Sequence, residues 1–422
     1  MPFTDHDARA ALTHEIHARP APKLPAPGEA AYLALVPNTP RDRSAERAHL
    51  EALLDHHGAP HPAPGATHFV TRLGNAVLKW ESHTEFVTYT ILTEGLDTPP
   101  YGGAGFGLLP PGWRAAAPGR RITSALIRIE LADGDDGLAE QVMTWLPGTA
   151  IAMARVLEDQ MVIAGDFLPD DQGHMRFAIF ARPGTGPGRI GRMVQSLCEV
   201  ETYKTMAMLG LVEARALGPD LNRIADDLGA LTSTMAKDSS APEETLHDLL
   251  EISADLERLG SRTAYRFGGT AAYAAIVEQR IAAMGERRFK GRQTFGDFMT
   301  RRFDPAMRTV RSVQGRMDSM TGRAARAADL LRTRVDVGRS AQNQALLESM
   351  DRRADLQLRL QQTVEGLSVV AISYYALNLV TYALAPLAKA AHIDKTTLTA
   401  GAVPVVVLAV WLMVRRIRKS VH

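Results

Sequence analysis

Two long apolar runs near the C-terminus constrain the fold of this chain more than any other feature of its sequence. Residues 366–388 (GLSVVAISYYALNLVTYALAPLA) and residues 396–414 (TTLTAGAVPVVVLAVWLMV) contain no formally charged side chain. A helix rises about 1.5 Å per residue, so each run is long enough to cross about 30 Å of hydrocarbon. The sequence therefore predicts a transmembrane hairpin, and the alternative is a pair of helices buried in a soluble core.

Basic residues around the two runs predict the orientation of this hairpin. Arginines precede the first run, and the tail at residues 415–422 contains RRIRK, whereas the outer loop at 389–395 contributes only Lys389 and Lys395. Lys and Arg concentrate on the cytoplasmic side of membrane spans. The N-terminus has acidic residues and no apolar stretch, so it does not resemble a signal peptide. We therefore expect both termini in the cytoplasm, with two crossings of the lipid bilayer.

The sequence pattern before the hairpin changes near residue 186, from strand-like runs to segments rich in helix formers. Residues 1–186 contain short β-branched or aromatic runs such as AAYLALV, AVLKWES and ITSALIRIEL, together with a helical pattern at 42–58, which predicts an α+β cytoplasmic domain. Residues 187–365 are rich in helix formers with apolar residues every three or four positions, which predicts a long helical stalk region. The GPGRIG segment at 186–191 matches GxGxxG but lacks the strand and acidic residue of a dinucleotide site, so a linker is expected.

An apolar stripe runs along the last predicted helix before the membrane. It comprises Leu347, Met350, Ala354 and Leu358, and it continues through Gln361 and Glu365 into the first apolar run. Such a stripe is typical of a coiled-coil stalk in a homo-oligomer. Packing against the preceding helices of the same chain is the alternative.

Composition and motifs exclude several classes of function. The chain has 48 basic and 47 acidic residues, so it has no excess positive charge to attract nucleic acid. A single cysteine, Cys198, cannot form an intramolecular disulfide, and a buried thiol is expected. No phosphate-binding loop, nucleophile elbow or paired-cysteine metal motif is present. The sequence therefore predicts a protein that is not an enzyme and has no cofactor.

Two segments contain residues that could bind a metal, both as weak signals. In HEIH, His14 and His17 are separated by three positions rather than the four of a zinc-protease helix, so a polar helix end is the alternative. In the strand-like WESHTEF, a period of two places Glu81, His83 and Glu85 on one face. A solvated or interdomain polar face is the alternative there.

Polar residues within the first apolar run are the candidates for a conducting path. Tyr374, Asn378 and Thr381 lie at i, i+4 and i+7, which is one face of a helix. An amide inside a membrane requires a hydrogen-bonding partner, which is either a neighbouring helix or water in a pore. The sequence does not decide whether these three residues contact a neighbouring helix or line a pore.

Several segments resemble one bacterial family along nearly the whole chain. They are THEIHARPAP near the N-terminus, KWESHTEFVTYT, RRFDPAMRTV and VEGLSVVAISYY. The chain resembles the family described as predicted membrane-anchored proteins with a domain of unknown function. This resemblance implies a location in the bacterial inner membrane and no established activity.

The predicted layout is also similar to that of CorA-type magnesium transporters, which have a cytoplasmic α/β domain, a helical stalk and two C-terminal spans. That similarity implies an oligomer whose first span lines a pore. Glu365 would then lie at the cytoplasmic mouth and Tyr374, Asn378 and Thr381 along the pore, with a divalent cation as a possible partner. The Gly-Met-Asn signature of that family is absent, and Lys389 and Lys395 would repel a divalent cation.

Two functions follow from these patterns. The first is an oligomeric inner-membrane ion channel or transporter of CorA-like layout with a cytoplasmic sensor domain. The second is a membrane-anchored interaction or scaffold protein whose hairpin only tethers the cytoplasmic domain. The polar face of the first run favours conduction, whereas the basic loop favours the anchor.

Overall fold

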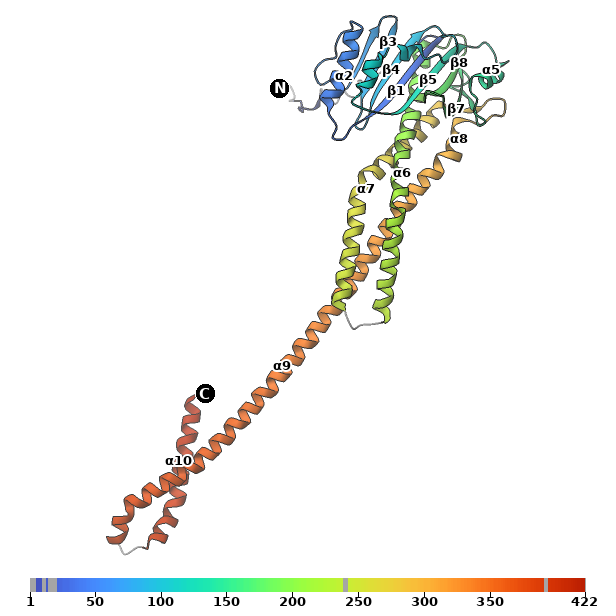
Figure 1. The fold of residues 1–422 in the computed structure, drawn as a ribbon. Coiled ribbons are helices and arrows are strands. Elements are labelled where there is room, and N and C mark those ends of the chain that lie inside the picture. Colours follow the sequence, from blue (N-terminus) through green and yellow to red (C-terminus); the bar gives the residue numbers. More distant parts are fainter. Residues whose placement is uncertain (1–4, 10–12, 14–20, 238–241, 391–393, 422) are drawn as a thin grey trace. The chain divides into compact units, whose positions relative to one another are not determined.

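The fold combines an α+β domain with long helices and two apolar helices near the C-terminus (Figure 1). The computed structural model describes residues 5–9, 13, 21–237, 242–390 and 394–421. The chain divides into two compact units. The first unit comprises Met1–Asp238 and His247–Ala327, and the second comprises Ser239–Leu246 and Ala328–His422.

A mixed sheet forms the centre of the first unit. Its strands are β1 (Gly28–Pro37), β2 (His68–Leu73), β3 (Ala76–Ser82), β4 (Val87–Glu94), β5 (Gly119–Leu131), β6 (Ala152–Val156), β7 (Met161–Pro169), β8 (Met175–Ala181) and β9 (Arg287–Arg288). Their order across the sheet is β2-β3-β4-β1-β5-β8-β7-β6-β9. Strands β5 and β8 are parallel, and the other neighbouring pairs are antiparallel. Strands β1 and β5 therefore lie side by side in the middle.

Short helices cover one face of this sheet. They are α2 (Arg43–His56), α3 (Ala104–Gly107), α4 (Pro111–Ala115) and α5 (Leu138–Trp145). Helix α2 begins after Asp42, whose Oδ1 accepts hydrogen bonds from the backbone N–H groups of Ser44 and Ala45 at 2.8 and 3.1 Å. Its fully buried Leu50 and Leu53 belong to the core cluster that includes residues of β1, β3 and β4. This apolar layer places the segment containing α3 and α4 above the middle of the sheet.

Helix α6 (Pro187–Lys237) packs on the opposite face. The hydroxyl groups of Tyr32 and Thr202 are 2.6 Å apart, which joins β1 to this helix. A Cβ atom at Gly191 would lie 1.6 Å from the carbonyl oxygen of Pro22, so only glycine permits this contact. The predicted linker at 186–191 is therefore wrong, because Pro187 is the first residue of the helix, a position that suits proline. Cys198, on the same helix, is buried as predicted.

Helices α7 (Pro242–Met284) and the first part of α9 (Asp304–Ala390) pack along α6. Thr270 of α7 donates a hydrogen bond to the carbonyl oxygen of Ala207 at 3.3 Å, and a Cβ at Gly210 would lie 2.2 Å from the Thr270 hydroxyl. Arg316 of α9 donates to the Asn222 side chain at 2.8 Å. These contacts form a helical bundle within the first unit (Figure 1).

The region predicted as a long helical stalk, residues 187–365, contains a non-helical connection between α7 and α8. Gly285 and Gly291 have φ values of +60° and +75°, which end one helix and allow a tight connection. Between them, β9 pairs with β6 and completes one edge of the sheet. Helix α8 (Phe295–Arg302) follows, with a capping box between Thr294 and Asp297.

The second unit contains the rest of α9 and helix α10 (Lys395–Val421). By length and composition, two helices near the C-terminus are able to cross a membrane. The predicted stripe lies on α9, where Leu347, Met350 and Leu358 are 65%, 58% and 59% exposed. Within the second unit, these three side chains are therefore exposed.

Candidate functional site

A cavity of about 500 Å³ lies on the sheet face that α3 and α4 cover. Leu33 and Leu35 of β1 and Leu126 of β5 form its apolar floor, because alternation along each strand turns these side chains away from α6. Residues 101–117 supply much of the remaining wall. From this segment the apolar lining residues are Tyr101, Phe106, Leu109, Trp113 and Ala117. The volume falls in the range that proteins use for small ligands.

Trp113 in this wall is held by a buried histidine. Its indole Nε1 donates to the carbonyl oxygen of His49 at 2.7 Å, and the two rings stack with centroids 3.9 Å apart. Because a carbonyl oxygen only accepts, Nε2 of His49 carries the proton of the 2.9 Å hydrogen bond to the Trp113 carbonyl. Burial lowers the pKa of His49, so the imidazole is neutral near pH 7. The indole side of the cavity is therefore preformed.

The rim of the cavity is polar and carries two guanidinium groups, those of Arg114 and Arg121. Arg121 donates to the carbonyl oxygen of Gln172 at 3.0 Å. Asp170 supplies the carboxylate of this rim, and its Oδ1 accepts hydrogen bonds from the backbone N–H groups of Gln172 and His174, both at 2.9 Å. Two guanidinium groups against one carboxylate give the rim a net positive charge, which attracts anions.

His174 completes the polar rim as a neutral group. Its ring stacks on Phe106 with centroids 4.4 Å apart, and its Nδ1 is 2.8 Å from the Ser124 hydroxyl. Burial lowers the pKa of His174, and the nearby Asp170 opposes this effect only partly. At neutral pH the positive charges at the rim are therefore those of the two arginines.

Four charged residues hold the base of the segment that covers the cavity. Arg128 of β5 contacts Glu29 at 2.9 Å and Glu130 at 2.6 Å, and it donates to the carbonyl oxygen of Asp97 at 3.0 Å. The Asp97 backbone N–H donates to Glu29 at 3.1 Å, while its side chain accepts from the N–H of Ala104 at 2.8 Å. Burial raises the pKa of Glu29 from 4.5 to about 7; the Asp97 carboxyl adds to this increase, and Arg128 opposes it.

Tyr101 connects the same segment to the far side of the cavity. Its backbone has a φ of +60°, an unfavourable value for a tyrosine. Its hydroxyl donates to the carbonyl oxygen of Phe177 in β8 at 3.0 Å. Backbone strain of this kind persists where surrounding contacts fix it, and it is frequent at ligand sites.

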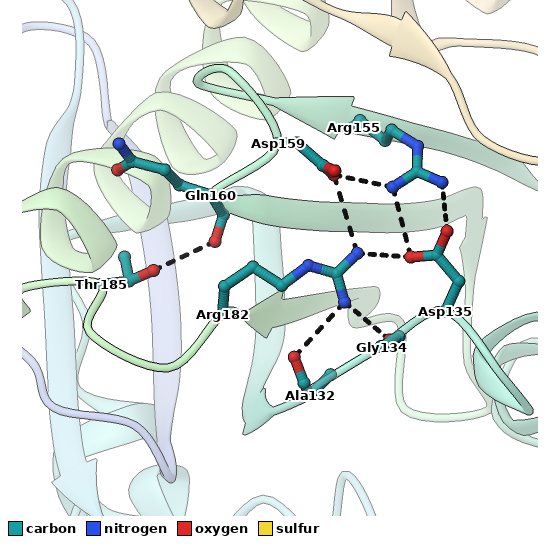
Figure 2. Close-up of polar contacts among 8 residues, drawn as sticks. All are labelled: Ala132, Gly134, Asp135, Arg155, Asp159, Gln160, Arg182 and Thr185. Carbon is teal, nitrogen blue, oxygen red and sulfur yellow. Dashed lines mark hydrogen bonds and ion pairs between the residues drawn. The ribbon is translucent and has the colours of Figure 1, made fainter.

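A second charged cluster, shown in Figure 2, lies at the end of β8 and around the β6–β7 turn. Asp135 accepts hydrogen bonds from both Arg155 and Arg182, and Asp159 contacts Arg155 at 2.8 Å. The turn residues 157–159 have φ values of 50°, 57° and 72°, so these ion pairs hold a strained backbone. Burial acts to raise the pKa of Asp135, but hydrogen bonds from the two arginines outweigh it and lower the pKa. With two carboxylates matching two guanidinium groups, this cluster is structural.

Of the residues predicted as possible metal ligands, Glu81, His83 and Glu85 lie in the described part of the chain. His14 and His17 lie outside the described residues. Strand β3 ends at Ser82, so the predicted strand does not extend over His83 and Glu85. Glu81 pairs with Lys79 at 3.1 Å, and Glu85 pairs with Arg266 at 2.7 Å. Within the described ranges, no group of three His, Cys, Asp or Glu side chains could hold a metal ion.

The predicted pore residues all lie on α9, at different levels of exposure. Thr381 is buried, and its hydroxyl donates to the carbonyl oxygen of Leu377 one turn earlier at 2.8 Å. Asn378 is half-buried and Tyr374 is exposed. Glu365 accepts a hydrogen bond from Gln361 at 3.4 Å. Their role as pore-lining residues stays a prediction.

Sequence reasoning did not find the cavity. Its local signal was the Pro/Gly-rich stretch at 98–113, which supplies part of the covering segment. The rim residues Arg121 and His174 come from a strand and a turn with no distinguishing motif. Only the pairing of β5 with β8 brings them together.

Comparisons with known proteins give a family and no closer relative. A search of curated proteins and a search of solved structures each find no match. One family model matches residues 4–421, nearly the whole chain. The chain therefore belongs to the family described as protein of unknown function (DUF3422).

Proposed function

We propose that this chain is a membrane-anchored binding protein whose sheet domain takes a small amphipathic anion into the cavity. One observation carries this proposal: a single cavity combines an apolar floor, formed by Leu33, Leu35 and Leu126, with a rim that holds two guanidinium groups. The ligand class is an aliphatic chain with one carboxylate or similar head group.

The physical chemistry of the two ends supports this ligand class. Each methylene group that leaves water for the apolar floor contributes about 0.8 kcal/mol. A hydrogen bond from Arg114 or Arg121 to a charged head group contributes roughly 1.5 to 3 kcal/mol, and the guanidinium fork fits a carboxylate. A cationic amphiphile would gain the first contribution but would meet repulsion at the rim.

We propose that the protein binds this ligand without transforming it. Ser124 and His174 resemble a nucleophile and its base, but Ser124 is only 1% exposed. Asp170, the nearest carboxylate on that turn, bonds to backbone amides rather than to the imidazole. A catalytic triad requires that carboxylate to orient the histidine.

Quenching of tryptophan fluorescence by 8-bromooctanoate tests the proposal, because bromine quenches an indole that it contacts. The protein is assayed in detergent with Trp411→Phe, which removes a tryptophan from an apolar C-terminal helix. We expect saturable quenching that is lost in Trp113→Phe. Arg121→Gln should weaken binding of the carboxylate about tenfold or more but leave 8-bromooctanol unchanged.

Two controls make the result decisive. Arg120→Gln removes the neighbouring exposed arginine, which does not line the cavity, and should leave affinity within twofold. An octyl ammonium analogue should bind more weakly than the carboxylate. Equal quenching with and without Trp113, or equal affinity for anion and cation, would reject the cavity as an anion site.

We also propose that α9 and α10 cross the bacterial inner membrane with both termini in the cytoplasm. The two apolar helices and the basic residues that follow the second one support this topology. A cysteine placed at Ala391 in a Cys198→Ala background should react with an impermeant thiol reagent in intact cells. Reaction only after lysis would contradict this orientation.

Ion conduction by a homo-oligomer is the second candidate function, and Asn378 is the observation that favours it. The amide is half-buried and makes no hydrogen bond within the described chain, although hydrocarbon requires a partner for it. The exposed stripe on α9 supplies a surface for self-association. In liposomes, Asn378→Leu should reduce flux of magnesium or potassium if the amide lines a pore. If the wild type carries no flux above empty liposomes, conduction is excluded and the hairpin is an anchor.

A further inference from the structure

A second pocket, of about 460 Å³, lies beside the edge of the sheet formed by β6 and β9. Four arginines line it: Arg288 in β9, Arg292 in the following loop, and Arg301 and Arg302 at the end of α8. Among the described residues, Asp297 is the carboxylate that pairs with this group, and it contacts Arg288 at 2.6 Å. Four guanidinium groups thus line one pocket, and Asp297 pairs with one of them.

The pocket contrasts with the charged cluster of Figure 2. There, Asp135 and Asp159 match Arg155 and Arg182, so the positive charge is neutralised inside the protein. In the pocket lined by Arg288, Arg292, Arg301 and Arg302, which we call the arginine pocket, the described side chains do not balance the positive charge. Like charges held close together repel, and an anion from solution relieves that repulsion.

The backbone around the arginine pocket is fixed before any ligand binds. Gln293 donates from its side chain to the carbonyl oxygen of Ala150 at 2.9 Å, and its own carbonyl accepts from the N–H of Met153 at 2.8 Å. The capping box of Thr294 and Asp297 sets the start of α8. The arginines therefore extend from a rigid loop and a short helix, an arrangement that lowers the cost of ordering on binding.

We propose that the arginine pocket binds a phosphoryl group. The planar guanidinium fork fits the oxygens of a phosphate in pairs, and several such forks suit a group with more than one negative charge better than a single carboxylate. The chemistry is the same for a free phosphate compound and for a phosphorylated lipid head group. A helix-end role for Arg301 and Arg302, which stabilises the helix dipole, is the alternative that the experiment must separate.

Equilibrium dialysis with radiolabelled inorganic pyrophosphate tests the inference. The full chain is placed in nanodiscs of phosphatidylcholine, which has no net charge. We expect saturable binding that falls at least tenfold in the double variant Arg301→Gln with Arg302→Gln. The double variant Arg301→Lys with Arg302→Lys keeps the charge at the helix end but loses the guanidinium fork. Its affinity for pyrophosphate should therefore lie between those of the wild type and the glutamine variant.

The control is the double variant Arg352→Gln with Arg353→Gln. These two adjacent exposed arginines lie on α9, away from the pocket lining, and replacing them changes the net charge by the same amount. It should leave binding within twofold. Equal weakening by both pairs, full affinity in the lysine pair, or no saturable binding to the wild type overturns the proposal. Repeating the assay with phosphatidic acid in the nanodisc identifies the source. Displacement of pyrophosphate then indicates a lipid head group, and unchanged binding indicates a soluble phosphate compound.

Discussion

The half-buried Glu29 carboxyl gives the sharpest prediction about stability, because it shares the guanidinium group of Arg128 with a second carboxylate. Arg128 contacts both Glu29 and Glu130, and Asp97 lies against the same cluster. The substitution Glu29→Gln keeps the shape of the side chain and an oxygen that accepts the Asp97 N–H. It removes the negative charge that the wild-type carboxyl acquires above its pKa.

The sign of the effect follows from proton linkage. Burial raises the pKa of Glu29 from 4.5 to about 7, so the folded chain holds this proton more tightly than the unfolded chain. The corresponding stability is present below pH 4.5 and is lost as the pH rises to about 7. One pKa unit corresponds to about 1.4 kcal/mol, so the shift from 4.5 to about 7 gives an upper limit of about 3.5 kcal/mol for the ionised carboxyl. Glu29→Gln should not show this loss.

Urea unfolding of the wild type and Glu29→Gln in parallel, followed by tryptophan fluorescence from pH 5 to pH 8, measures the effect. The difference between the two proteins cancels the other titrating groups. We expect the variant to gain about 2.5 kcal/mol relative to the wild type across this interval, because part of the effect has already occurred at pH 5. A constant difference would show that burial does not hold the proton. A wild type that gains relative stability with pH would show that the ion pair with Arg128 dominates.

Two further substitutions test the packing between the sheet and α6. Lys79→Met should destabilise the protein by about 3 to 5 kcal/mol in urea, because it leaves Glu81 unpaired where the two side chains are 3% and 11% exposed. Lys79→Met with Glu81→Leu should recover most of that loss, and equal damage in both would contradict a charge effect. Gly191→Ala should make the sheet domain sensitive to limited proteolysis, because its Cβ would lie 1.6 Å from the Pro22 carbonyl oxygen. Gly188→Ala, whose Cβ meets only a flexible arginine at 3.8 Å, should remain resistant, and equal cleavage of both would refute the close contact.

The strands that could be predicted from the sequence are those with a clear pattern and clear turns. The segment 76–82 coincides with β3, and the segment 30–36 lies within β1. Strands β6 and β7 were not predicted. Most of their residues are buried, so AMARV and MVIAGDF show nearly continuous apolar character rather than alternation. Strand β9 has two residues and is defined only by its partner.

The start of α6 shows why local motifs mislead. A linker was expected at GPGRIG because the strand and acidic residue that a dinucleotide site requires are missing after it. Gly191 instead provides space for a backbone carbonyl of residue 22, which is distant in sequence. A glycine required for close packing and a glycine required for flexibility look the same in a single sequence.

Neither pocket could be predicted, because each is formed by residues that are distant in sequence. Charged residues in a sequence do not show which of them become neutralised, because their partners come from other strands and turns. Arg155 and Arg182 meet Asp135 through the pairing of β6, β7 and β8, whereas Arg301 and Arg302 lie where the described chain supplies no matching carboxylates. The near-balance of 48 basic and 47 acidic residues correctly gives no reason to expect a basic protein. It does not reveal that one pocket holds positive charge without a partner, and that local imbalance is what makes an anion the expected ligand.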